Sequence, residues 1–286
     1  MEIQRVGVVG CGLMGSGITE ASARAGLDVW VVDVDPASVD AGRNRVMRSI
    51  SRAEKGGKLT ASEAEAALAR IQFSHDMSSL ADCQVVVEAV VEAEAVKVAV
   101  FEALDKIVED SDAVLASNTS SIPIMKLAMA TSRPGQVIGI HFFNPVPVLP
   151  LVELVTSLLT SDETAARAKH LAADLLGKQV IRSQDRAGFI VNALLIPYIL
   201  SAIRMLESGF ATAEDIDLGM VKGCAHPMGP LALADLIGLD TTMAVANSLY
   251  QEFKEPLFAP PPLLARMVEA GLLGRKSGRG FYSHNA

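Results

Sequence analysis

The sequence is short of cysteine, and this shortage excludes two kinds of site. Three cysteines occur among 286 residues, Cys11, Cys83 and Cys224, and they lie far apart without a CxxC pair. Neither a disulfide framework nor a zinc site is indicated by this spacing. We therefore expect no metal site and a reducing, cytoplasmic environment.

Excess positive charge and long apolar runs are also missing. The net charge of −8 argues against a nucleic-acid partner, which would require a surface rich in Lys and Arg. The most apolar segment, 189–203, is shorter than the roughly 20 residues of a membrane span and contains Asn192 and Pro197. We expect it to be a buried helix with a kink at the proline. We also expect no secretory signal, because the chain runs directly into an apolar strand.

What the sequence does have is the pattern of a globular α/β protein. Hydrophobic residues make up 50% of it and charged residues 20%, which predicts one or two folded domains. Short β-branched runs alternate with segments of helix length, and this alternation is typical of a mostly parallel sheet covered by helices on both faces. The expected strands are Val6–Val9, Val29–Val32, Val85–Val87, Val114–Ala116 and Val137–Ile140.

Two further segments depart from this alternation. Residues 40–70 form a polar and basic insertion, which we predict to be a helical arm. After about Asp185 the β-branched runs stop and only helical patterns remain. The sequence therefore predicts a Rossmann-type domain at 1–185 and an all-helical domain at 186–286. The helices expected in the second domain are Phe189–Leu206, Glu214–Val221, Leu231–Leu236, Thr241–Phe253 and Pro262–Ala270.

A glycine motif follows the first predicted strand. Gly10, Gly12 and Gly15 form a GxGxxG pattern that opens a helix; it permits a tight turn, a close approach of pyrophosphate and close packing of helix on sheet. Asp33 ends the next strand, where a carboxylate binds ribose hydroxyls and favours NAD over NADP. As an alternative, Asp33 and the neighbouring Asp35 are a turn residue or helix cap.

Polar residues follow two later strands. Ser117–Ser121, with the sequence SNTSS, comes directly after Val114–Ala116, and His141 ends the strand Val137–Ile140. Both positions point to the carboxyl edge of the sheet, where such folds bind ligands, and His is suited to acid–base chemistry. Glu153 lies in an apolar run and needs a partner, such as an imidazole. The alternatives are a helix cap for SNTSS and a hydrogen-bonded core residue for His141.

Six motifs taken together resemble one known family, that of the 3-hydroxyacyl-CoA dehydrogenases, especially its bacterial 3-hydroxybutyryl-CoA members. The resemblance covers nearly the whole chain. The motifs are SNTSS at Ser117–Ser121, HFFNPVP at His141–Pro147, VELV at Val152–Val155, GFIVN at Gly188–Asn192, HPMGP at His226–Pro230 and GRKSGRGFY at Gly274–Tyr282.

The resemblance implies roles for individual residues. His141 is expected to be the catalytic base, Glu153 its orienting acid, and Ser120 and Asn192 the residues that hydrogen-bond the substrate's 3-oxygen. The cofactor, NAD, is expected to contact Gly10, Gly12, Leu13, Met14, Gly15, Asp33, Glu92, Lys97, Ser120 and Asn144. For Glu92 and Lys97 the alternative is ordinary charge on a helix surface.

Coenzyme A needs local cations on an acidic protein, and the basic arm is the expected anchor. Ser49 and Lys55 align loosely with the family's contacts, although Gly56-Gly57 follows Lys55 here and Arg52 or Lys58 could substitute. The alternative is a solvated helix face.

The activity implied by the resemblance is that of an oxidoreductase acting on an acyl-CoA, with a place in fatty acid or butanoate metabolism. The implied assembly is a homodimer joined through the helical domain. Two other functions stay open on the sequence: an NAD-dependent dehydrogenase of sugar acids such as gulonate, and a non-catalytic protein that retains an NAD fold.

Overall fold

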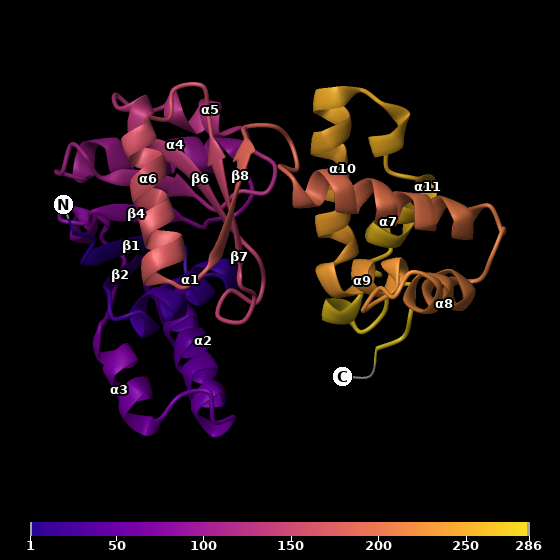
Figure 1. The fold of residues 1–286 in the computed structure, drawn as a ribbon, viewed down its shortest axis with the longest axis horizontal. Coiled ribbons are helices and arrows are strands. Elements are labelled where there is room, and N and C mark those ends of the chain that lie inside the picture. The colour runs from indigo at the N-terminus through magenta and orange to yellow at the C-terminus, as the bar shows by residue number, and fades with distance from the viewer. Residues whose placement is uncertain (1, 285–286) are drawn as a thin grey trace. The chain divides into compact units, whose positions relative to one another are not determined.

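The computed structural model describes residues 2–284. The chain divides into two compact units, Met1–Arg186 and Ala187–Ala286, coloured from indigo to salmon and from orange to yellow in Figure 1. The division falls one residue after the predicted domain boundary. Each unit has its own buried core.

The first unit is built on one eight-stranded sheet, in the order β3-β2-β1-β4-β5-β6-β7-β8. Neighbouring strands are parallel except β6 and β7, which pair antiparallel. The strands are β1 (Arg5–Val9), β2 (Asp28–Val32), β3 (Ile71–Ser74), β4 (Val85–Glu88), β5 (Val114–Ser117), β6 (Val137–Phe142), β7 (Leu151–Thr156) and β8 (Gln179–Gln184).

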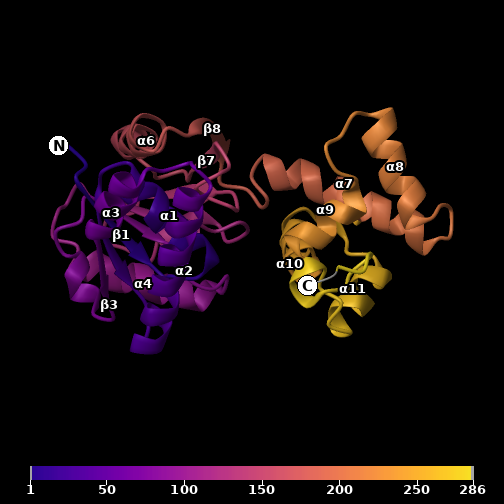
Figure 2. The same ribbon diagram turned by 90° about the horizontal axis from the view of Figure 1, so that it is seen from below.

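Helices cover both faces of this sheet (Figures 1 and 2), as continuous β-branched strands require. Alternate residues of β1, Val6 and Val8, join a core with side chains from α1 and α6, while α4 and α5 bury Phe101 and Ile124 on the sheet's other side. The helices of this layer are α1 (Leu13–Arg24), α4 (Glu94–Ile107), α5 (Ile124–Ala128) and α6 (Asp162–Lys169). The predicted Rossmann-type sheet is confirmed.

The basic insertion forms a helical arm, as predicted. It consists of α2 (Pro36–Lys55) and α3 (Ala61–Ala69), which project from the sheet at the bottom of Figure 1. Asp35 caps α2 by accepting a hydrogen bond from the Ser38 amide, so the helix-cap alternative is correct for Asp35. Thr60 and Glu63 form a capping box that starts α3 and satisfies backbone donors at the helix start.

Three strands were not predicted from the sequence, and the five predicted ones were too short, four by one residue and β6 by two. β3 and β8 lie at the two edges of the sheet, where polar residues are tolerated and the apolar pattern is weak. β7 was recognised only as an apolar run around Glu153. β6 continues to Phe142, which pairs with Val152, so His141 lies inside the strand rather than at its end.

The second unit is helical, and its helices match the predicted ones to within three residues. They are α7 (Val191–Glu207), α8 (Ala213–Gly223), α9 (Pro230–Ile237), α10 (Leu239–Phe253) and α11 (Pro262–Glu269). Short 3-10 segments at Met77–Leu80, Pro134–Gln136, Pro256–Phe258 and Arg275–Ser277, and a π-helical segment at His170–Leu175, complete the chain. Within residues 2–284, no helix has the length and apolar character that a membrane span requires.

Candidate active site

His141 and Glu153 form a buried pair at the junction of β6 and β7. They are direct partners in the antiparallel register of these strands, and the Nδ1 atom of His141 lies 2.7 Å from the Oε2 atom of Glu153. The exposed fractions are 5% for His141 and 0% for Glu153. Cross-strand partners point to the same face of a sheet, so the register itself brings the imidazole and the carboxylate together.

Ser120 lies on the other side of the imidazole. Its Oγ atom is 3.2 Å from the Nε2 atom of His141. A carboxylate only accepts hydrogen bonds, so Glu153 selects the tautomer that carries hydrogen on Nδ1. Nε2 is then the basic nitrogen, and it faces the Ser120 hydroxyl. The three residues therefore form a relay of the kind used to move one proton.

The loop that carries Ser120 is held by its neighbours. The Asn118 side-chain oxygen accepts a hydrogen bond of 2.9 Å from the Phe142 amide, which ties the end of β5 to the end of β6. The Thr119 hydroxyl accepts hydrogen bonds from the amides of Ser121 and Ile122. These bonds form a turn and not a helix cap, because α5 begins at Ile124 with Pro123, which has no capping side chain, at its N-cap, and the turn delivers Ser120 to His141.

Glu92 organises this loop from the neighbouring strand-to-helix turn. Its Oε1 atom accepts hydrogen bonds from the Thr119 hydroxyl, the amides of Ser120 and Ser121, and the Ser121 hydroxyl. Burial alone would raise the pKa of Glu92, but the ammonium of Lys97 and these hydrogen bonds outweigh it, so the pKa is lowered. A carboxyl group with a lowered pKa stabilises the folded state at neutral pH, and that contribution disappears only when the pH falls through the lowered pKa.

Lys97 is fully buried, with an exposed fraction of 0%, so the helix-surface alternative is wrong for this residue. Its Nζ atom lies 2.6 Å from the Oε1 atom of Glu88 and 3.3 Å from the Oε2 atom of Glu92. Glu88 was not predicted as a functional residue, because it is the last residue of a strand and belongs to none of the motifs. Its only sequence signal is a carboxylate that directly follows three valines.

The glycine loop has the shape expected for a pyrophosphate site. Gly10 has a φ of +90°, and a side chain on Gly15 would place its Cβ 1.8 Å from the Gly10 carbonyl oxygen. At Gly12, by contrast, a Cβ would meet nothing within 4 Å, so the backbone at the start of α1 is open to a ligand. The Asp33 carboxylate accepts a hydrogen bond of 2.7 Å from the Cys11 amide. These features fit a dinucleotide.

Arg45 also contacts the glycine loop, and this contact was not predicted from the sequence. Its Nη1 atom donates a 2.6 Å hydrogen bond to the carbonyl oxygen of Cys11 and lies 3.4 Å from the Ser16 hydroxyl. This contact crosses from α2 to the glycine loop. A basic residue in an arm offers no sequence signal for such a long-range bond.

Three other residues predicted as contacts belong to the first unit but not to this hydrogen-bonded cluster. Asn144 is exposed beyond the end of β6, Ser49 is half-buried on α2, and Lys55 is exposed at the end of α2. Asn192 is the second residue of α7 in the helical unit, where it is half-buried. Their roles stay predictions.

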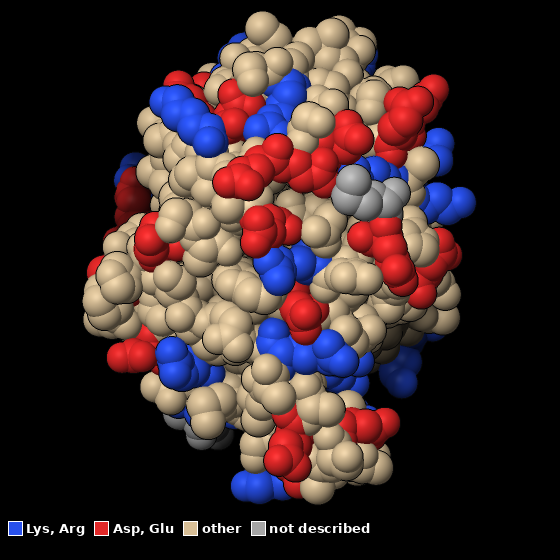
Figure 3. Space-filling model, turned by 90° about the vertical axis from the view of Figure 1, so that its left-hand side faces the viewer, with Lys and Arg blue, Asp and Glu red and all other residues tan. Residues whose placement is uncertain are grey.

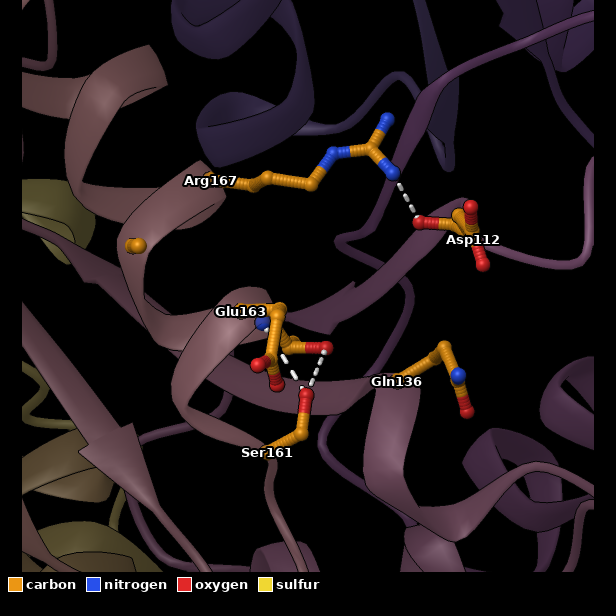
Figure 4. Close-up of a pocket in the computed structure, with 7 residues that line it drawn as sticks. Asp112, Gln136, Ser161, Glu163 and Arg167 are labelled. Carbon is orange, nitrogen blue, oxygen red and sulfur yellow. Dashed lines mark hydrogen bonds between the residues drawn. The ribbon is translucent and has the colours of Figure 1, made fainter. Parts of the chain in front are cut away.

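A separate hollow of about 620 Å³ lies elsewhere in the first unit. Asp112 and Gln136 in its lining precede β5 and β6, and Ser161 caps α6. Figure 4 shows Arg167 reaching toward Asp112 across it. Because Ser120 and His141 lie at or beyond the opposite ends of β5 and β6, this hollow is not part of the candidate active site.

Among residues 2–284, no group of three or more His, Cys, Asp or Glu side chains is placed to hold a metal ion. On the face drawn in Figure 3, basic and acidic side chains are mixed rather than gathered by sign.

Known proteins are similar to this chain over nearly its whole length. The model of the 3-hydroxyacyl-CoA dehydrogenase NAD binding domain matches residues 5–186, and that of the same family's C-terminal domain matches residues 188–284. A 3-hydroxybutyryl-CoA dehydrogenase of Mycobacterium tuberculosis is 61% identical over 99% of both chains. The mitochondrial hydroxyacyl-coenzyme A dehydrogenase of Sus scrofa is 38% identical over 99% of this chain and 91% of its own.

A solved structure agrees with these matches. That of the (S)-3-hydroxybutyryl-CoA dehydrogenase PaaH1 from Ralstonia eutropha superimposes with a TM-score of 0.94 at 47% identity, covering 100% of both chains. The two family models, the full-length relatives and the site geometry lead to one conclusion: this chain belongs to the 3-hydroxyacyl-CoA dehydrogenase family, whose cofactor is NAD.

Proposed function

We propose that this chain interconverts (S)-3-hydroxyacyl-CoA and 3-ketoacyl-CoA with NAD, and that 3-hydroxybutyryl-CoA and acetoacetyl-CoA are its short-chain pair. The observation that carries the proposal is the line of contacts from Ser120 to His141 to Glu153. Relatives named for this activity match the chain from end to end.

His141 acts as the general base in the oxidising direction. Nε2 removes the proton of the 3-hydroxyl, and the resulting imidazolium is stabilised by the Glu153 carboxylate at 2.7 Å. Ser120, beside Nε2, hydrogen-bonds the 3-oxygen as negative charge develops on it. Asn192 is the second residue predicted to hold this oxygen. In the reducing direction, protonated His141 returns the proton to the same oxygen.

The glycine loop and Asp33 are the residues that would hold NAD. The amides at the start of α1 would donate hydrogen bonds to the pyrophosphate, for which Gly12 leaves space, and the Asp33 carboxylate would accept hydrogen bonds from the ribose hydroxyls. When bound, NAD supplies the acceptor for the hydride that leaves C3 of the substrate. Leu13, which is 63% exposed on this loop, and Met14 are predicted to line the cofactor.

The arm supplies cations for the phosphates of coenzyme A. A shallow hollow of about 460 Å³ runs along α2, and its lining residues are Ala41, Asn44, Arg45, Met47, Arg48 and Ser51. Neither Ser49 nor Lys55 lines it. Two arginines in one hollow support the arm as the anchor, with Arg48 as a contact that the sequence did not single out.

The substrate class is tested by following NADH consumption with acetoacetyl-CoA and with longer 3-ketoacyl-CoA compounds. We expect the highest kcat/KM for acetoacetyl-CoA. Gulonate with NAD is included, because a sugar-acid dehydrogenase is the alternative that the sequence left open. Turnover of gulonate without turnover of any acyl-CoA would overturn the proposal, and a preference for long chains would overturn its short-chain part.

Glu153→Gln tests the proposed proton path. The glutamine oxygen still accepts the Nδ1 hydrogen, so the imidazole keeps its tautomer, but the negative charge that stabilises the imidazolium is lost. We expect kcat to fall by about 10-fold, because a charged hydrogen bond becomes a neutral one. Steady-state kinetics with acetoacetyl-CoA and NADH measure this. A variant with unchanged kcat would remove Glu153 from the mechanism.

We also propose that the protein is a homodimer joined through the helical unit. Several large apolar side chains of this unit are exposed, including Leu194 at 73%, Phe210 at 79% and Leu218 at 56%, and apolar surface of this kind marks interfaces. Light scattering should give a mass near twice the 30.2 kDa of one chain. A mass of one chain at micromolar concentration would contradict the dimer.

The cytoplasm is the compartment that we propose, in fatty acid or butanoate metabolism. All three cysteines are free thiols, and Cys224 is exposed, which is typical of a reducing environment.

A further inference from the structure

Glu88 is a buried carboxylate for which the reaction has no direct use. It ends β4, has an exposed fraction of 0% and uses both of its oxygen atoms. Oε1 accepts hydrogen bonds from Lys97 Nζ at 2.6 Å and from the Val90 amide at 2.7 Å. Oε2 accepts one from the Ser117 hydroxyl at 2.7 Å. A charge at this depth is costly unless it is fully paired, and Glu88 is paired on every side that the structure shows.

The partners of Glu88 come from three different elements. Ser117 is its register partner at the end of β5 and opens the loop that carries Ser120. Lys97 lies in the first turns of α4, and the Val90 amide belongs to the turn between β4 and α4. One carboxylate thus joins the ends of two strands to the helix that follows the first of them.

From Glu88 the contacts lead to the reacting groups. Lys97 Nζ lies between Glu88 at 2.6 Å and Glu92 at 3.3 Å. Glu92 in turn accepts hydrogen bonds from the amides of Ser120 and Ser121, and Ser120 contacts His141. Every link of this path lies within the first unit.

We propose that Glu88 is a positioning residue for the dehydrogenase reaction, which acts through Lys97 and Glu92 to hold the Ser120 hydroxyl at His141. This inference rests on the proposed function, in which Ser120 binds the 3-oxygen. Without the negative charge of Glu88, Lys97 keeps one carboxylate partner and is drawn toward Glu92. The Glu92 carboxylate, which accepts hydrogen bonds from the amides of Ser120 and Ser121, then shifts, and the loop shifts with it.

The role predicts a specific kinetic signature for Glu88→Gln. Glutamine keeps the size of the side chain and most of its hydrogen bonds but lacks the charge. Because Ser120 acts on the 3-oxygen as charge develops, kcat should fall by about 10-fold, while KM for acetoacetyl-CoA stays within about 2-fold. The Kd for NADH should rise by a smaller factor than kcat falls, because Lys97 and Glu92 are also expected to contact NAD. Glu94→Gln is the matched control, since Glu94 lies on α4, the helix of Lys97, but is exposed and paired with Lys126 in the contacts shown. The kcat of this control should equal that of the wild type.

A double-mutant cycle with Ser120→Ala decides whether Glu88 acts through Ser120. We expect Glu88→Gln to lower kcat by less than about 2-fold in the Ser120→Ala background, because the loop then lacks the hydroxyl group that Glu88 is proposed to position. If both single variants are slow and their effects multiply, the inference about Glu88 fails while the proposed role of Ser120 stands. If Ser120→Ala is as fast as the wild type, both fail. A higher Kd for NADH with unchanged kcat would instead make Glu88 a cofactor-side residue and overturn the inference.

Thermal unfolding is followed for each variant, so that loss of folded protein is not taken for loss of positioning. If Glu88→Gln does not accumulate as folded protein, Glu88→Asp replaces it in the cycle, because the carboxylate that is one methylene shorter is withdrawn from Lys97 Nζ, which Glu88 contacts at 2.6 Å. The same outcome is expected: a fall in kcat that disappears in the Ser120→Ala background. A fall that persists there overturns the inference.

Discussion

His141→Gln should slow turnover by about two orders of magnitude or more, while the affinity for NADH stays near that of the wild type. The imidazole is the only group in the Ser120–His141–Glu153 relay that can take a proton from the 3-hydroxyl and return it. Glutamine fills similar space and can still hydrogen-bond Glu153, so the fold is retained. Single-turnover kinetics with acetoacetyl-CoA and a fluorescence titration with NADH measure the two quantities separately.

The matched control for this experiment is His170→Gln. His170 also pairs with a carboxylate, Asp174, at 2.8 Å, but its side chain is 47% exposed on the protein surface. Its replacement should leave kcat unchanged. Turnover of His141→Gln within a factor of three of the wild type would show that His141 is a hydrogen-bonded core residue rather than the base.

Gly15→Ala is expected to weaken NADH binding strongly and to destabilise the first unit. The new Cβ would lie 1.8 Å from the Gly10 carbonyl oxygen, so the backbone of the loop must move. Each charged hydrogen bond to the pyrophosphate contributes about 1.5–3 kcal/mol, so misplacing two of them weakens NADH binding by about 100-fold or more. We also expect a loss of about 1–3 kcal/mol of stability from the forced repacking.

Gly12→Ala separates these two effects. A Cβ at Gly12 meets no protein atom within 4 Å, so the melting temperature should stay close to that of the wild type. The methyl group nevertheless occupies the side from which pyrophosphate approaches, and NADH binding should weaken as it does in Gly15→Ala. Calorimetric titration and thermal unfolding of both variants provide the comparison. Equal losses of stability, or NADH binding by Gly12→Ala at wild-type affinity, would contradict this account of the loop.

Local patterns predicted much of this fold. The glycine loop, the five apolar strands and the helices of the second unit each depend on residues that are neighbours in the sequence, and all of them are present. β8 was missed because its residues are mostly polar and partly exposed, so that only its pairing with β7 makes it a strand. The propensities of such residues are weak without a partner strand.

The site shows the same division between local and long-range information. The positions of Ser120 and His141 at the carboxyl edge follow from the parallel order of their strands. The contact of Arg45 with Cys11 and the burial of Lys97 between Glu88 and Glu92 depend on tertiary packing. A sequence cannot distinguish such a lysine from one on a solvated helix face, and the surface alternative for Lys97 was wrong for that reason.

The single antiparallel junction in the sheet has a consequence for how activity can be lost. Side chains alternate between the two faces of a strand, so a slip of β7 by one residue would place Val152 or Leu154 opposite His141 and turn Glu153 to the other face. A one-residue slip therefore leaves no carboxylate opposite the imidazole. Damage to the pairing of β6 and β7 should therefore leave some molecules fully active and others inactive, instead of lowering the catalytic activity of every molecule slightly.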